Sequence, residues 1–235
     1  MLRQSLNGLY LNRLAGDSSL FGRVASSPIF YFFETKNIIK LFNIMSRQII
    51  LASISPRRRE LMKLLKIKFK AVDSGFDEKI DPHLSHPELV KQLALGKALA
   101  ASKKYPNAII IAADTMVSFK GKVIGKPKDK TDAIKMLKSF SGRKHFVYSG
   151  VVVMDAASAK IISGHDTTVV HFRKLSDKDI TSYLKFGEAM DKAGGYGPLA
   201  KGLNLISKIE GDGTTQFGMP LMFVSNALLK LGVKV

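Results

Sequence analysis

Residues 51–59 combine a hydroxyl-rich turn with a run of three arginines, and both features suit the binding of an anion. The segment reads Leu-Ala-Ser-Ile-Ser-Pro-Arg-Arg-Arg. Its serine–proline pair is typical of a helix start, where backbone N–H groups have no partner inside the helix and can bind an anion. Ser53, Arg57 and Arg58 add donors that match phosphate oxygens. Because cations in a first helical turn oppose the helix dipole, a bound anion would compensate for them.

Two acidic positions are candidates for metal binding or proton transfer. Asp114 follows the run Ala-Ile-Ile-Ile-Ala-Ala, which is typical of a strand buried on both faces. A carboxylate at the end of such a strand lies where α/β sheets place functional residues, so Asp114 is a candidate general base or ligand of a hard cation, with a simple turn residue as the alternative. Glu78 belongs to an Asp-Glu pair that follows another predicted strand. This pair suits a metal, although an ordinary acidic loop is the alternative for Asp77.

Two glycine-containing segments complete the candidates. Lys126 lies between a glycine and a rigid proline, and a turn lysine is the alternative. Residues 191–197 read Asp-Lys-Ala-Gly-Gly-Tyr-Gly, and glycines permit a ligand to approach the backbone closely. The glycine spacing formally fits a dinucleotide fingerprint, but the segment neither follows a convincing strand nor opens a helix. The sequence also lacks the phosphate-binding motif of P-loop enzymes.

The elements that must position these residues alternate from residue 48 onward. Apolar runs and cap signals predict strands at 48–53, 69–72, 108–113, 146–154 and 161–172, a hairpin at 116–124, and helices at 56–65, 86–104, 131–140, 177–186 and 220–231. Ser85 and Glu88 form a predicted capping box. This order predicts an α/β fold with a mixed, bent sheet flanked by helices, in two lobes around a cleft.

Composition limits the possible functions. Of 235 residues, 46% are hydrophobic and 24% charged, which is typical of a globular protein. The absence of cysteine excludes a disulfide, a thiolate zinc site, an iron–sulfur cluster and a cysteine nucleophile. The net charge of +18 favours an anionic partner, whether nucleic acid, a membrane surface or a phosphorylated small molecule. Because the basic residues are spread along the chain, we expect no specific nucleic-acid partner and no membrane partner.

Residues 1–47 differ in composition from the rest of the chain. They hold arginines, lysines and serines but only two acidic residues, Asp17 and Glu34. This composition is that of an organellar transit peptide, with a dispensable tail before a start at Met45 as the alternative. We therefore predict an N-terminal extension over 1–47 and a domain over 48–235. The expected location is the cytoplasm, with a mitochondrion or plastid-type organelle as the alternative.

Taken together, the motifs resemble the Maf-like nucleoside triphosphate pyrophosphatases. The resemblance rests on LASxSPRR, a DE pair, AADT, GKP, SGxxHxVxSG and DKAGxYG, in this order over 48–235. It implies a fold related to the inosine triphosphate pyrophosphatases, and hydrolysis of a nucleoside triphosphate to the monophosphate and pyrophosphate with a divalent cation, Mg or Mn. The DKAG form is similar to the dTTP/UTP branch, with a 7-methyl-GTP pyrophosphatase or a non-catalytic nucleotide-binding homologue as alternatives. A homodimer is possible.

The resemblance also implies roles for individual residues. Asp114 falls on the catalytic aspartate and, with Glu78, on the metal-binding positions. The phosphate-binding positions are Ser53, Arg57, Arg58, Lys97 and Lys126. One departure is Leu199, which stands where the family has a glutamine that lines the active site, and Gln216 is a candidate to compensate for it.

Overall fold

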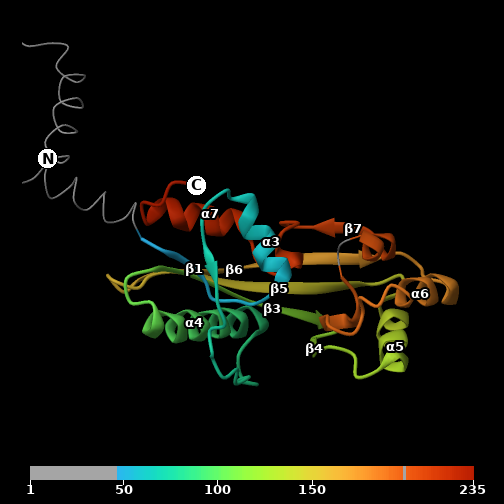
Figure 1. The fold of residues 1–235 in the computed structure, drawn as a ribbon. Helices are drawn as coiled ribbons and strands as arrows, with labels where there is room; N and C mark the ends of the chain where they lie inside the picture. Colours follow the sequence, from blue (N-terminus) through green and yellow to red (C-terminus); the bar gives the residue numbers. More distant parts are fainter. Residues whose placement is uncertain (1–46, 198–199) are drawn as a thin grey trace, which may run out of the picture. The chain divides into compact units, whose positions relative to one another are not determined.

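The computed structural model describes residues 47–197 and 200–235. These residues form a seven-stranded sheet in the order β2-β1-β3-β5-β6-β7, with β4 paired to β3 (Figure 1). The strands are β1 (Ile49–Leu51), β2 (Lys70–Ala71), β3 (Ile109–Phe119), β4 (Lys122–Ile124), β5 (Lys144–Asp155), β6 (Lys160–Phe172) and β7 (Ile206–Glu210). The α-helices are α3 (Pro56–Leu64), α4 (His86–Lys104), α5 (Lys130–Phe140), α6 (Asp177–Leu184) and α7 (Leu221–Lys230). The predicted mixed α/β architecture is confirmed.

The sheet is mixed because β1 pairs in parallel with β2 and β3, whereas β3, β5, β6 and β7 pair antiparallel. Its centre is β3, whose side chains alternate between two packed faces. Ile109, Ile111 and Ala113 pack in a cluster with residues of α3 and α7. Ile110 and Ala112 pack in a second cluster with residues of α4. Figure 1 shows α3 and α7 on one side of the central strands and α4 on the other.

Strand β3 is longer than the sequence predicted, and this corrects the expected position of Asp114. The prediction ended the strand at Ala113, but its pairing with β5 continues to Ser118 opposite Phe146. Asp114 therefore lies inside the strand, opposite Gly150. A polar residue does not end the ladder here because the backbone bonds to β5 do not depend on the side chain.

The other edge of β3 is paired only in part. Strand β1 pairs with β3 as far as Ile111, and β4 begins to pair with it at Val117. Among the described residues, no strand pairs with 112–116 on this edge. The end of β1, the segment after β4 and the middle of β3 therefore meet where the sheet is locally open.

The hydrophobic core includes two main parts along the sheet, and both belong to one compact unit over Arg47–Val235. The division into two lobes stays a prediction. Around β1, the core is built by α3, α4 and α7 on the two faces of the sheet. At the far ends of β3 and β5, a separate cluster is built by α5 and α6 together with Tyr196, and it includes Phe140 and Phe172. A cavity lies between the two parts and is lined by residues of both.

The local sequence signals were confirmed in part. The Ser85–Glu88 capping box is present at the start of α4. Ser55 precedes α3, but its side chain makes no cap bond there. Strand β7 was not predicted.

No helix among the described residues has the length and apolar character needed to cross a membrane.

Two predictions fall outside the described residues. One is the N-terminal extension over 1–47, of which only Arg47 is described, in an ion pair with Asp155. The other is the departure at Leu199.

Candidate functional site

A cavity of about 160 Å³ lies against the second half of β3 and the first part of β5. Thr115, Val117 and Val147 contribute from the two strands. The remaining lining residues come from the start of α3, the segment after β4, the glycine-rich loop and the turn before α7: Ser55, Arg57, Arg58, Lys126, Asp191, Ala193, Tyr196, Gln216, Phe217 and Gly218. Residues far apart in the sequence thus converge on one site that carries three basic side chains.

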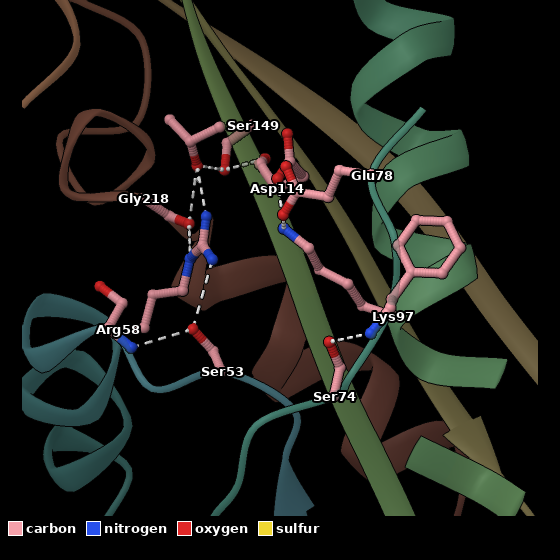
Figure 2. Close-up of polar contacts among 11 residues, drawn as sticks. Ser53, Arg58, Ser74, Glu78, Lys97, Asp114, Ser149 and Gly218 are labelled. Atoms are coloured by element: carbon pink, nitrogen blue, oxygen red, sulfur yellow. Dashed lines mark hydrogen bonds and ion pairs between the residues drawn. The ribbon is translucent and has the colours of Figure 1, made fainter. Parts of the chain in front are cut away.

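Arg58 is the best-fixed cation of this cavity (Figure 2). Its Nε donates to the carbonyl oxygen of Gly218 at 2.8 Å, one terminal nitrogen donates to Thr115 Oγ1 at 3.1 Å, and the other donates to Ser53 Oγ at 3.3 Å. All three acceptors are uncharged. Burial lowers the pKa of Arg58, and the negative charges of Asp114 and Glu78 oppose this change. The guanidinium remains cationic at neutral pH because its pKa is so high.

The contacts of Arg58 depend on a glycine at position 218. Its φ of 113° lies in the region that disfavours side chains, and its carbonyl oxygen accepts from both Arg58 Nε and Thr115 Oγ1, the latter at 2.9 Å. Thr115 Oγ1 also lies 2.8 Å from Ser149 Oγ on the neighbouring strand. A chain of hydroxyl groups therefore connects the arginine to the central strands.

A second polar cluster is built around Lys97. Its Nζ lies 2.6 Å from Asp114 Oδ1 and 2.7 Å from Glu78 Oε1. The side chains of Lys97 and Asp114 are only 11% and 12% exposed, whereas that of Glu78 is 51% exposed. One buried ammonium thus holds two carboxylates, and the cluster carries a formal net charge of −1.

The loop that carries Glu78 is held against α4. The Ser74 hydroxyl accepts from the backbone N–H of Phe76, and the Phe76 ring packs over Gly96 of α4. A Cβ at Gly96 would lie 2.2 Å from the ring, so only glycine allows this approach. Because Lys97 follows Gly96 directly, the same contact brings Glu78 to the lysine.

The two clusters lie on opposite faces of β3. Asp114 shares the α4 face with Ala112, whereas Thr115 shares the α3 face with Ala113. Figure 2 shows the Lys97 cluster on one side of the strand and the Arg58 cluster on the other. They approach each other along the edge at 112–116 that no described strand covers, and both carboxylates act on the charge of Arg58.

The seven predicted site residues therefore fall into two groups. Arg57, Arg58 and Lys126 line the cavity, and Ser53 bonds to Arg58. The second group is Glu78, Lys97 and Asp114, none of which lines the cavity. Lys97 was predicted to bind phosphate, but in the structure it is paired with the two carboxylates.

The far wall of the cavity is built around Tyr196. Its hydroxyl lies 2.7 Å from His145 Nε2, and His145 is fully buried. Burial lowers the pKa of His145 to about 4, so this imidazole is neutral at pH 7. The backbone N–H of Gly194 donates to the carbonyl oxygen of Gly125 at 2.9 Å, which ties the glycine-rich loop to the segment that carries Lys126.

Sequence reasoning missed Thr115, Ser149 and Gly218 as parts of the site. Thr115 stood beside Asp114 in the motif, but its role depends on Arg58, 57 positions away. Gly218 is 160 positions from Arg58. A glycine before Met219-Pro220 was the only local signal of a special backbone conformation.

Comparison with known proteins places the chain in a family. The family model described as Maf-like protein matches residues 48–231. The chain belongs to the Maf-like protein family. The match covers both clusters and the cavity, but not residues 1–47.

Curated relatives of this Maf-like protein are identical to it at about two fifths of the aligned positions. A dTTP/UTP pyrophosphatase of Dictyoglomus turgidum is 43% identical over 189 residues, covering 80% of this chain and 98% of the relative. The dTTP/UTP pyrophosphatases of Alkaliphilus oremlandii and Methanosarcina mazei are 44% and 42% identical, and 94% and 96% of their lengths are covered.

Solved structures that resemble the chain are more distant. A HAM1 protein from Coxiella burnetii has a TM-score of 0.47 at 17% identity, with coverage of 78% of this chain and 99% of the other. The Ham1 protein of Staphylococcus aureus has a TM-score of 0.38 at 16% identity, with coverage of 54% and 72%.

Proposed function

We propose that this Maf-like protein is a nucleoside triphosphate pyrophosphatase that hydrolyses dTTP and UTP to the monophosphate and pyrophosphate. Three curated relatives of at least 42% identity carry the name dTTP/UTP pyrophosphatase, and nearly their whole lengths are covered. The observation that carries the proposal is the guanidinium of Arg58, which is held in a cavity by neutral acceptors only and so keeps its full charge for a substrate.

The charges of the cavity support a triphosphate substrate. Arg57, Arg58 and Lys126 line it from two separate segments. A triphosphate carries about four negative charges, and guanidinium groups bind phosphate oxygens through strong, charge-assisted hydrogen bonds. Asp191 also lines the cavity, but its carboxylate is paired with Lys192 at 2.7 Å. The cavity therefore offers an uncompensated positive charge to the phosphates.

The acidic cluster supports a divalent cation near the same phosphates. Asp114 and Glu78 converge on one point, which the cationic nitrogen of Lys97 occupies in the structure. No group of three or more histidine, aspartate or glutamate side chains suited to a metal occurs within 47–197 and 200–235. Mg²⁺ is commonly held by one or two carboxylates together with water and substrate phosphates, so the two carboxylates fit such an ion. When bound, the ion would neutralise charge on the phosphates and lower the pKa of water.

Asp114 is the proposed catalytic residue. Lys97 bonds to its Oδ1, and Oδ2 has no hydrogen-bond partner among the described residues. The free oxygen can accept a proton from the attacking water, and Lys97 keeps the carboxylate oriented. Arg57, Arg58 and Lys126 would bind the phosphates, with Ser53 orienting Arg58. A phosphate chain at the open edge of β3 would contact both clusters.

The experiment that tests this function is pyrophosphate release by the purified protein. dTTP, UTP, CTP and 7-methyl-GTP are compared at equal concentration, with Mg²⁺ or Mn²⁺ and after addition of a chelator. We expect the highest kcat/KM on dTTP and UTP, and loss of turnover with the chelator.

Preference for 7-methyl-GTP would assign the sister activity, and nucleotide binding without turnover would assign a regulatory role. Either result contradicts the proposal. The homodimer and the cytoplasmic or organellar location remain predictions of the sequence.

A further inference from the structure

One polar group in the cavity has no partner. Gln216 lines the cavity, yet it is only 6% exposed. Its Oε1 is buried, and no donor among the described residues lies within hydrogen-bond distance. An amide oxygen buried without a donor destabilises a protein, because the group has lost its hydrogen bonds to water. The arrangement becomes favourable if a ligand supplies the donor.

The turn that carries Gln216 is fixed from both sides. Thr215 Oγ1 donates to Asp166 Oδ2 of β6 at 2.8 Å, and Thr168 Oγ1 donates to the carbonyl oxygen of Asp212 at 2.8 Å. Two residues after Gln216, the carbonyl oxygen of Gly218 accepts from Arg58. The amide of Gln216 is therefore held at a fixed position relative to Arg58, the cation that we propose binds the phosphates.

The surroundings of Gln216 suit a flat ring. Val117, Val147, Tyr196 and Phe217 line the same cavity, whereas its cations come from the start of α3 and from Lys126. Apolar and aromatic side chains contact the faces of a base, and a few polar groups at its edge set the specificity. Of the described residues that line the cavity, Gln216 alone has a side-chain amide.

We propose that Gln216 recognises the base by accepting a hydrogen bond from N3–H of uracil or thymine, an inference that rests on the proposed function. The edge of these bases presents one N–H donor between two carbonyl acceptors. The glutamine amide presents an acceptor and donors side by side, and so complements this edge. Methylation at N3 removes the donor and adds bulk at the same position. Gln216 is therefore a specificity-determining residue of the pyrimidine site.

The test compares UTP with N3-methyl-UTP on the wild-type protein and on Gln216→Leu. In the wild type, methylation should lower kcat/KM about tenfold, the scale of one lost neutral hydrogen bond. Gln216→Leu should lower kcat/KM on UTP by a similar factor, and methylation should then cause no further loss. Because the variant removes an unpartnered polar group, its melting temperature should be equal to or higher than that of the wild type.

Gln92→Leu is the matched control, because Gln92 is an exposed glutamine on α4 outside the cavity. It should retain the wild-type response to methylation. An equal penalty in wild type and Gln216→Leu, or no penalty in the wild type, overturns the role of Gln216 while the proposed function stands. Absence of pyrophosphate release from every triphosphate by the wild type overturns the proposed function itself. If Gln216→Leu does not fold, Gln216→Met takes its place, and the wild-type comparison needs no variant.

Discussion

The two polar clusters on either side of β3 differ in how their charges are neutralised. In the Lys97 cluster, one ammonium faces two carboxylates at 2.6 and 2.7 Å, so opposite charges are in direct contact. In the Arg58 cluster, the guanidinium contacts a carbonyl oxygen and two hydroxyl groups, none of which is charged. The first cluster has an excess of negative charge and the second an excess of positive charge.

Under the proposed function, this difference assigns the two clusters to different parts of a metal–triphosphate complex. We expect the phosphates at the Arg58 cluster, where no carboxylate contacts the guanidinium. We expect the cation at the Lys97 cluster, because its two carboxylates leave a net negative charge after pairing with one ammonium. The edge of β3 at 112–116, which no described strand covers, is where one substrate complex would contact both clusters. The following variants alter one cluster at a time.

The largest effect is expected from Asp114→Asn. The change keeps the shape but removes the charge that serves as base or metal ligand, so kcat should fall by roughly a hundredfold or more. KM should change much less, because the Arg58 cluster is intact. Steady-state kinetics on UTP measure both values. Asp81→Asn, in the loop before α4 and outside both clusters, is the control and should behave as wild type, because asparagine keeps the side-chain oxygen that accepts from the backbone N–H of His83. Near-normal turnover of Asp114→Asn would refute the catalytic assignment.

Arg58→Lys tests the other cluster. Lysine keeps the positive charge but cannot donate simultaneously from the planar fork that reaches Gly218, Thr115 and Ser53. Loss of charge-assisted hydrogen bonds of about 1.5–3 kcal/mol corresponds to a fall in kcat/KM of roughly 10- to 100-fold. The neighbouring Arg59 is exposed and does not line the cavity, so Arg59→Lys is a matched control. Equal kinetics for the two variants would show that the contacts of Arg58 do not serve catalysis.

Lys97→Met tests whether the charge pairing of the acidic cluster is structural. Removing the ammonium leaves Asp114 buried beside Glu78 without a counter-charge. The free energy of unfolding should fall by about 3 kcal/mol, the low end for a broken buried pair, because Glu78 is half exposed. Denaturant titration measures this change. Lys103→Met, an exposed position on the same helix, should have almost no effect. The double variant with Lys97→Met and Asp114→Asn should be more stable than Lys97→Met alone, because the unpaired charge of Asp114 is then removed. If the changes in unfolding free energy of the two single variants simply add up in the double variant, the pairing of Lys97 with Asp114 is contradicted.

His145→Phe examines the wall of the cavity through its pH dependence. Burial lowers the pKa of His145 from 6.5 to about 4. Between these two pH values, the imidazole is protonated in the unfolded state but not in the folded state. The folded state therefore has its full stability with respect to His145 above pH 6.5, and it loses stability as the pH falls towards 4. Between pH 7 and 5 this amounts to about 2 kcal/mol of unfolding free energy. His145→Phe should reduce this loss, whereas His83→Phe, in an exposed loop, should retain it.

The sequence predicted well the elements whose signals are local. The proline at the start of α3, the capping box of α4 and the isoleucine run of β3 each act within a few residues. Strand β7 was missed because its five residues, Ile206–Glu210, are mostly exposed and give no clear alternation. It forms only because β6 offers its edge.

The site was predicted by residue type rather than by geometry. Asp114 was expected at the end of a strand, but it lies inside one, because the backbone pairing of β3 with β5 continues through it. The counter-charge for its buried carboxylate is Lys97 of α4, a contact that the sequence did not indicate. The division into two clusters was not predictable either. It follows from the alternation of Asp114 and Thr115 between faces, which becomes meaningful only once β3 is known to continue through both.

The smallest effect is expected from removal of residues 1–44, so that the chain starts at Met45. The described residues that form both clusters and line the cavity lie within 53–218. The family match begins at residue 48, and 98% of the Dictyoglomus turgidum relative is covered by a match to 80% of this chain. The truncated protein should therefore keep its kcat/KM on UTP within about twofold and its melting temperature within a few degrees, because no described contact of either cluster is lost. A start at Met45 keeps Arg47 and its ion pair with Asp155, whereas a start at Gln48 removes this pair. The difference in melting temperature between the two truncated proteins therefore measures the contribution of this contact. A truncated protein that is insoluble or inactive would show that residues 1–44 contribute to the domain, and the comparison between the two clusters would then have to include them.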